Sequence, residues 1–159
     1  MTVIESIPLR EGADKDGFRA AARHLIADDV PPERVAFEIG SAPSLFATGS
    51  VDMAVPVVLP REVAKLIDAV VCHREPEKYA LLYALIWRAT HGERALLEVH
   101  SDPLVFRLAR MEKEVRRDIH KMHAFVRFRR LPGEAEAYSA WFEPDNFILD
   151  AVAKDVRKG

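Results

Sequence analysis

The sequence predicts a mostly helical α+β fold in a single domain over residues 1–159, with a C-terminal antiparallel β-hairpin and short N-terminal strands. Apolar side chains recur at helical spacing in several segments, and alternation with a period of two residues occurs near both ends of the chain. A length of 159 residues and an apolar content of 49% suit one core. Residues 1–55 are expected to form an α/β part, and residues 56–150 the helical core with the hairpin.

The N-terminal part of the chain predicts two strands with a helix between them. Residues 2–9 and 34–39 are rich in β-branched and alternating apolar side chains, which is typical of strands. The segment between them has apolar side chains at helical spacing, and Pro31 and Pro32 end that helix. Residues 40–59 combine Gly, Ser and Pro without a period, and they predict a loop and the most suitable internal boundary.

Two helices are expected next, over residues 60–71 and 76–91, because each begins at a proline and the second meets a glycine at its end. The middle of the second helix is apolar nearly all round, which is typical of a buried central helix. Tyr79, Tyr83 and Trp87 lie along one side of it. They predict a ladder of core side chains, with a platform for stacking on a base or ligand as the alternative.

The C-terminal part predicts a hairpin. Residues 124–131, AFVRFRRL, alternate with a period of two, and a Pro-Gly turn separates them from AYSAWF, which resumes a strand pattern. An antiparallel hairpin over residues 124–143 is therefore expected. Pro144 and Asp145 are expected to open a last short helix.

Basic residues are concentrated in one block of the chain. The formal net charge of −2 excludes the wholesale basicity of a histone-like binder, but not a local basic patch. Residues 103–131 hold nine basic and three acidic residues, so this block carries +6 and the rest of the chain −8. Seven of the nine are arginines, whose planar guanidinium suits contact with phosphate.

The block begins with a helix over residues 103–123, which starts at the N-cap Asp102 and the first-turn Pro103. One face of this helix is apolar and the opposite face is cationic. Because the basic helix and the basic strand are consecutive, we expect their charges to meet nucleic-acid phosphates on one surface. The candidate nucleic-acid-binding residues are Arg110, Lys113, Arg116, Arg117, His120, Lys121, Arg127 and Arg129. An ordinary solvated amphipathic helix is the alternative.

The cationic face allows a quantitative expectation. If Arg110, Lys113, Arg117 and Lys121 each contact one phosphate, the logarithm of the binding constant should fall with the logarithm of salt concentration with a slope of about −3 to −4. Phe106 falls on the same side of the helix, where it either stacks on a base or packs on a neighbouring segment.

Titratable side chains in the helix suggest two further hypotheses. His120 and His123, with Asp118 or Glu114 nearby, have the residue types of a metal site. The surrounding basic residues disfavour a cation and no third ligand is specified, so neither a metal nor a cofactor is predicted. A DNA-processing enzyme centred on His120 and a carboxylate such as Asp118 is a minor alternative.

Other groupings of nucleophile and base have structural interpretations. Cys72 and His73 are adjacent in sequence, which rarely gives catalytic geometry, so a buried thiol near a helix end is expected. The run from His100 to Asp102 resembles a triad in composition, but a helix cap explains it better. No glycine-rich phosphate loop, Cys-x-x-Cys, His-Glu-x-x-His or Gly-x-Ser-x-Gly motif occurs, which argues against those enzyme classes and leaves catalytic activity undecided.

The expected compartment follows from cysteine content and hydropathy. One cysteine cannot form an internal disulfide framework, which favours a reducing compartment. No apolar stretch is long enough for a membrane helix, and the acidic N-terminal residues lack the basic region of a signal peptide. A soluble, cytoplasmic protein without a membrane partner is expected.

Several segments carry a resemblance to a known family. They are MEKEVRRDIHKMHAFVRF at residues 111–128, AWFEP at 140–144, CHREPEKYALLYALIWR at 72–88 and SDPLVFRLARM at 101–111, with RRDIHKMHAFVRF the most specific. In these segments the chain resembles the domain found N-terminal to uracil-DNA glycosylase-superfamily domains in long bacterial fusion proteins. The same domain occurs elsewhere as a standalone DNA metabolism protein encoded beside a radical-SAM partner.

The resemblance implies an association with DNA repair, through handling of DNA or docking to the glycosylase, but no established chemistry for the domain. Matched by position, Arg116, Arg117, His120, Lys121, Arg127 and Phe128 belong to the basic signature of the family, and Trp141, Phe142 and Pro144 to its closing hairpin. After AWFEP the family continues with a His-containing segment, whereas this chain has DNFILDAVAKDVRKG. The glycosylase motifs are absent, so uracil excision is not expected in these residues.

Taken together, the residues and the resemblance predict a DNA-repair-associated domain that contacts nucleic-acid phosphates and is accessory to a uracil-DNA glycosylase. DNA is the expected partner. The alternative is a protein-interaction module that docks a glycosylase-type or radical-SAM protein, with the basic residues meeting an acidic surface.

Overall fold

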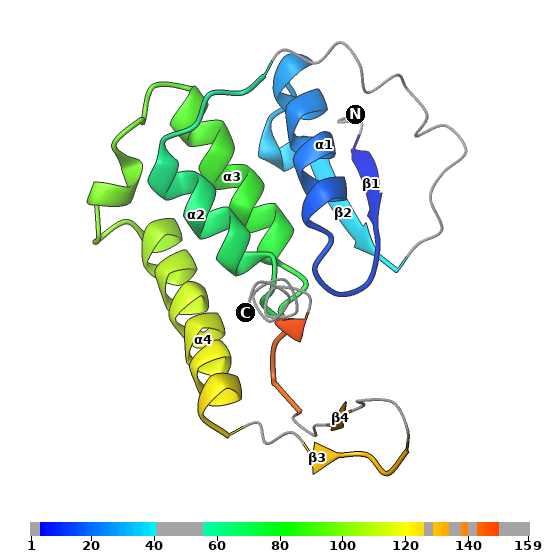
Figure 1. Cartoon of the computed structure of the whole chain (residues 1–159). Coiled ribbons are helices and arrows are strands. Elements are labelled where there is room, and N and C mark those ends of the chain that lie inside the picture. The colour runs from blue at the N-terminus through cyan, green and yellow to red at the C-terminus, as the bar shows by residue number, and fades with distance from the viewer. Residues whose placement is uncertain (1–3, 41–55, 126–128, 134–137, 140–142, 150–159) are drawn as a thin grey trace.

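The N-terminal part is a parallel βαβ unit. The computed structural model describes residues 4–40, 56–125, 129–133, 138–139 and 143–149 (Figure 1). Strands β1 (Glu5–Leu9) and β2 (Val35–Ile39) pair in parallel along their whole length. Parallel neighbours need a crossover connection, which α1 (Lys15–Ala27) supplies, followed by the short 3-10 helix η1 (Pro32–Arg34). Both predicted strands and the helix between them are confirmed.

Within the described residues, three longer helices follow this unit: α2 (Arg61–Val70), α3 (Lys78–Thr90) and α4 (Pro103–Phe125), with the 3-10 helix η3 (Leu96–Glu98) before α4. Their bounds lie within two residues of the predicted ones. Gly92 follows α3 with a φ of +101°, a left-handed conformation that ends a helix and that glycine adopts without strain. None of the described helices is long and apolar enough to span a membrane.

Helix α3 is the centre of the core. It packs between the βαβ unit on one side and α2 and α4 on the other (Figure 1). Tyr79 and Tyr83 are completely buried, and the ring of Phe37 in β2 contacts both of them, with ring centroids 6.1 and 6.2 Å apart. The hydroxyl group of Tyr83 donates a hydrogen bond to the carbonyl oxygen of Val30 at 2.5 Å. The predicted core ladder is confirmed for the two tyrosines, which leaves no open platform there for a ligand.

The predicted fold class is wrong at the C-terminal end. Helix α4 continues to Phe125, where the first strand of the hairpin was expected. Within the described residues, the only strands there are β3 (Arg129–Arg130) and β4 (Tyr138–Ser139), a two-residue antiparallel pairing in place of a hairpin over 124–143. Each residue added to an existing helix forms one further hydrogen bond. The helix therefore continues into residues whose short alternating pattern is typical of a strand. The fold is mostly helical with two short parallel strands at the N-terminus.

Residues 143–149 return to the helical core (Figure 1). Asn146 and Ile148 are buried, and the backbone N–H of Phe147 donates to the carbonyl oxygen of Cys72 at 2.7 Å. Residues 143–148 contain no helix, so the helix expected to begin at Pro144 is absent there. The segment instead lies against the connection between α2 and α3.

Candidate functional site

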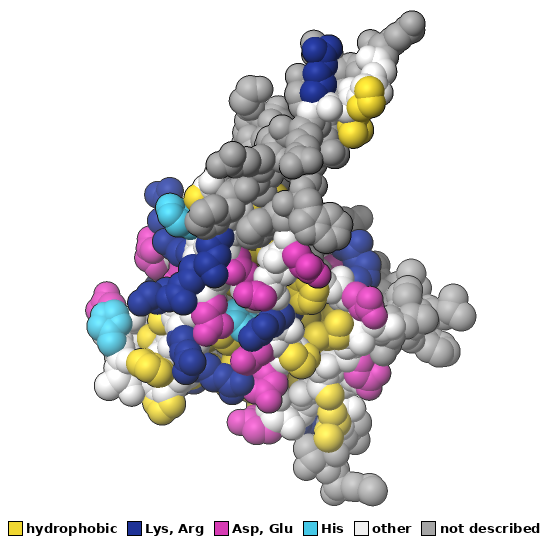
Figure 2. All heavy atoms as spheres, turned by 90° about the horizontal axis from the view of Figure 1, so that it is seen from below, with side chains coloured by type: hydrophobic (Ala, Val, Ile, Leu, Met, Phe, Trp, Pro, Cys, Tyr) yellow, Lys and Arg dark blue, Asp and Glu magenta, His cyan; other side chains and the backbone are white. Residues whose placement is uncertain are grey.

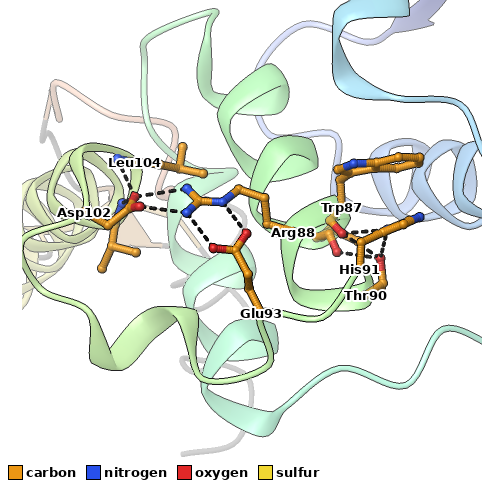
Figure 3. Close-up of polar contacts among 9 residues, drawn as sticks. Trp87, Arg88, Thr90, His91, Glu93, Asp102 and Leu104 are labelled. Carbon is orange, nitrogen blue, oxygen red and sulfur yellow. Dashed lines mark hydrogen bonds and ion pairs between the residues drawn. The ribbon is translucent and has the colours of Figure 1, made fainter.

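The start of α4 is fixed by a cluster of charges at the end of α3 (Figure 3). Asp102 accepts hydrogen bonds from the backbone N–H groups of Leu104 at 2.9 Å and Val105 at 3.2 Å, so the predicted N-cap is confirmed. Arg88 donates to both carboxylate oxygens of Asp102, at 3.1 and 2.7 Å, and also binds Glu93. These contacts hold the pKa of Asp102 below its usual value and give it a structural role.

One face of α4, here called the inner face, packs on the core. Leu108 and Val115 are fully buried. Asp118 is only 5% exposed, and its Oδ2 atom accepts hydrogen bonds from the backbone N–H of Asn146 at 2.9 Å and from the side-chain amide of Asn146 at 2.8 Å. The Oδ1 atom of Asn146 in turn accepts from the backbone N–H of Arg74 at 3.0 Å. This chain of hydrogen bonds joins α4, the C-terminal segment and the connection between α2 and α3.

The opposite face of α4, here called the outer face, is solvent-exposed and basic. Successive residues of an α-helix are rotated by about 100° around the helix axis. On this basis the residues of the outer face lie within about 60° of Phe106 around the axis, and the buried residues of α4 lie farther round the helix. Figure 2 shows Lys and Arg side chains gathered on this part of the surface, with acidic side chains among them. The outer face comprises Phe106, Arg110, Lys113, Arg117, His120 and Lys121, all exposed.

Three arginines of α4 have carboxylate partners. Arg107 contacts Glu75 at 3.2 Å and Glu77 at 2.6 Å, both in the segment that precedes α3. Arg116 pairs with Glu112 one turn away at 2.7 Å. Arg110 is 73% exposed and makes a longer contact of 3.5 Å with Glu114. Part of the predicted basic surface is therefore neutralised within the protein.

Three cations on the outer face have no such partner. Lys113, Arg117 and Lys121 form neither a hydrogen bond nor an ion pair with any residue that the structure describes. They are spaced four residues apart, so they form a row along the helix. At a rise of 1.5 Å per residue this row is about 12 Å long. Neighbouring like charges at this spacing destabilise a helix slightly, and a bound anion would relieve that repulsion.

His73, in the connection between α2 and α3, contacts α4 through the side chain of Glu114. Its side chain is buried, its Nε2 atom lies 2.6 Å from Oε2 of Glu114, and its Nδ1 atom accepts a hydrogen bond from the backbone N–H of Glu75 at 3.1 Å. The second contact assigns the proton of a neutral ring to Nε2, which donates to Glu114 and lowers the pKa of that carboxyl group. Cys72 is buried and its thiol donates to the carbonyl oxygen of Asp68, so the predicted buried thiol is confirmed.

Lys78 is a buried cation that the sequence analysis did not single out. It is 1% exposed, and its Nζ atom donates to the carbonyl oxygens of Gly12 at 2.8 Å and Val71 at 2.7 Å. The rings of Tyr79 and Phe147 lie 4.9 Å from it. Burial lowers the pKa of Lys78 to about 8. The available sequence signal was a lysine in the first turn of a helix that is apolar nearly all round.

The remaining candidates are not assembled into a catalytic or metal site. Asp118 points to the core and His120 to solvent, so the structure does not bring together the proposed acid–base pair. Among the residues described, no group of three His, Cys, Asp or Glu side chains is arranged to hold a metal ion. Arg127 lies outside the described residues, and Arg129 belongs to β3.

These features define a class of protein: a mostly helical domain with an N-terminal parallel strand pair, whose longest helix has one structural face and one basic, exposed face. The chain belongs to the family described as a domain of unknown function, DUF4130, whose model matches residues 76–158. The match includes α3, α4 and the C-terminal segment, and so both faces of α4. No curated protein and no solved structure matches the chain.

Proposed function

We propose that the outer face of α4 binds nucleic-acid phosphates as part of a DNA-repair-associated function. The observation that carries the proposal is the row of Lys113, Arg117 and Lys121, three exposed cations without a carboxylate partner in the described part of the chain. Ion pairs neutralise Arg107 and Arg116, so the expected footprint is smaller than the full list of basic residues. Arg110, whose ion pair is long and exposed, is the natural fourth contact.

The distribution of charge supports one oriented contact. Outside residues 103–131 the chain carries a net charge of −8, which repels a polyanion. A nucleic acid is therefore attracted to one side of the protein. The resemblance to the domain that accompanies uracil-DNA glycosylases supports DNA as the partner and an accessory role beside a glycosylase-type or radical-SAM protein. A cytoplasmic location belongs to the same proposal.

A charge-matched pair of variants tests the proposal. Lys113→Gln/Arg117→Gln/Lys121→Gln removes three positive charges from the outer face. The control removes three exposed positive charges elsewhere: Arg23→Gln/Arg61→Gln/Arg94→Gln. Fluorescence anisotropy with a labelled DNA oligonucleotide at low salt should show an affinity loss of about tenfold or more for the first variant only. Equal losses in both variants, or no binding by the wild-type protein to single- or double-stranded DNA, would contradict the proposal.

A protein-interaction module is the second candidate. The ion pairs Arg110–Glu114 and Arg116–Glu112 place acidic and basic groups side by side on α4. Such a mixed pattern of charges is also compatible with binding to the surface of a partner protein. A purified glycosylase-type or radical-SAM protein that binds after nuclease treatment, and is released by the outer-face substitutions, would favour this function over nucleic-acid binding.

A further inference from the structure

Phe106 is an exposed aromatic residue at the N-terminal end of the outer face. It is 65% exposed, although the other large apolar side chains of α4 that are described turn toward the core. At about 100° per residue, Arg110, Lys113 and Arg117 lie within about 40° of Phe106 around the helix axis. Packing within the described structure does not account for an aromatic ring at this position.

The ring and the cations form one linear array. Phe106 lies one turn before Arg110, and the array continues through Lys113 and Arg117 to Lys121. At 1.5 Å per residue it is about 22 Å long, with the aromatic ring at one end and positive charges along the rest. Proteins that bind single strands combine these two elements: a basic track for the backbone and an aromatic side chain on which a base stacks.

We infer that the outer face of α4 binds a single-stranded nucleic acid, with one unpaired base stacked on Phe106 and the following phosphates on Arg110, Lys113, Arg117 and Lys121. This inference rests on the proposed function and adds the class of nucleic acid. In a duplex the faces of the bases are covered by their neighbours, so the ring reaches one only after unstacking. A single strand exposes its base faces, and every base has one, so stacking on Phe106 selects unpaired nucleotides without reading their sequence.

The test compares three labelled ligands with the full-length protein at low salt: a thymidine 12-mer, a 12-mer of abasic deoxyribose with the same phosphates, and a 12-base-pair duplex. The wild-type protein should prefer the thymidine strand over the abasic strand by about tenfold. Phe106→Ala should remove this preference but keep the salt dependence of binding, and Phe106→Trp should restore the preference. Ile4→Ala, which shortens a similarly exposed apolar side chain outside α4, should change neither property.

A second substitution separates stacking from simple apolar contact. Phe106→Leu keeps an apolar side chain but no π face, so it should behave as Phe106→Ala does if the base stacks. Because Phe106 is exposed, all these variants should retain the thermal unfolding midpoint of the wild-type protein, which differential scanning fluorimetry verifies.

The outcomes separate the inference from the proposed function. Equal wild-type affinity for the thymidine and abasic strands, a preference for the duplex, or an unchanged preference in Phe106→Ala would overturn the inference. The proposed function would stand in each case if Lys113→Gln/Arg117→Gln/Lys121→Gln still weakened binding. If that triple variant binds all three ligands as the wild type does, both fail. Loss of a protein partner in Phe106→Ala, with oligonucleotide binding unchanged, would overturn the inference in favour of protein docking.

Discussion

The two faces of α4 carry charges of different kinds. On the inner face, Asp118 is buried and has hydrogen-bond partners from a segment 28 residues away. On the outer face, Lys113, Arg117 and Lys121 are exposed and have no partner in the part of the chain that the structure describes. A buried polar group is tolerated when its hydrogen bonds are satisfied, as those of Asp118 are by Asn146, whereas a solvated charge needs no partner. The inner face therefore holds the structure together, and the outer face is free to bind a ligand.

The largest expected effect is on stability, and it comes from the inner face. Asp118→Ala leaves the two N–H donors of Asn146 without their acceptor in a buried position, and it should lower the free energy of unfolding by about 3 kcal/mol. Arg117→Ala, one residue earlier but on the outer face, should change it by less than about 0.5 kcal/mol. Urea denaturation measures both. Similar values for the two variants would remove the distinction between the faces.

A second prediction contrasts a buried lysine with an exposed one. In the unfolded chain Lys78 has the ordinary lysine pKa of 10.5, and burial in the folded protein lowers this pKa to about 8. Between these values the unfolded state binds more protons, so the free energy of unfolding should rise by about 2 kcal/mol from pH 8 to pH 10. Above pH 10 stability should fall again, because burial raises the pKa of Tyr79 and of Tyr83.

Chemical denaturation across this pH range provides the measurement. Lys78→Met should abolish the rise, at a cost in stability from the two carbonyl groups that lose their donor. Lys113→Met, on the outer face, should retain the rise. A flat profile for the wild-type protein between pH 8 and pH 10 would show that Lys78 titrates as an exposed lysine does.

The smallest expected stability effect belongs to the outer face as a whole. Lys113→Gln/Arg117→Gln/Lys121→Gln should alter the free energy of unfolding by at most about 0.5 kcal/mol, with a slight gain expected because like charges one turn apart repel each other. Thermal unfolding at low and high salt measures this, and the difference between wild type and variant should shrink at high salt. A loss of several kcal/mol would mean that these cations have structural partners after all.

Sequence patterns predicted the helices well because their signals are local. Asp102 and Gly92 mark a start and an end within a few residues, and the helical period correctly separates the two faces of α4. The hairpin prediction failed because the alternating pattern begins directly after a long helix, and α4 continues to Phe125, into the residues predicted as the first strand. The Arg116–Glu112 pair has helical spacing and was predictable in principle, whereas the contacts of Arg107 depend on how α3 packs against α4.

The buried polar contacts could not be inferred from the sequence. The bonds of Asp118 to Asn146 and of Lys78 to Gly12 join residues that are far apart in the chain and meet only in the folded protein. Asp118 therefore looked like a free carboxylate beside His120, although it is a structural side chain on the opposite face.

The salt dependence of DNA binding reports how many phosphates the outer face of α4 contacts. For wild-type protein and a labelled oligonucleotide, the four phosphate contacts of Arg110, Lys113, Arg117 and Lys121 predict a slope of about −3 to −4 in a plot of the logarithm of the association constant against the logarithm of salt concentration. Lys113→Gln/Arg117→Gln/Lys121→Gln leaves only the contact of Arg110 and should reduce the slope to about −1, and the control Arg23→Gln/Arg61→Gln/Arg94→Gln should leave it unchanged. A wild-type slope near zero, or the same slope in all three proteins, would contradict the assignment of the outer face as a phosphate-binding surface.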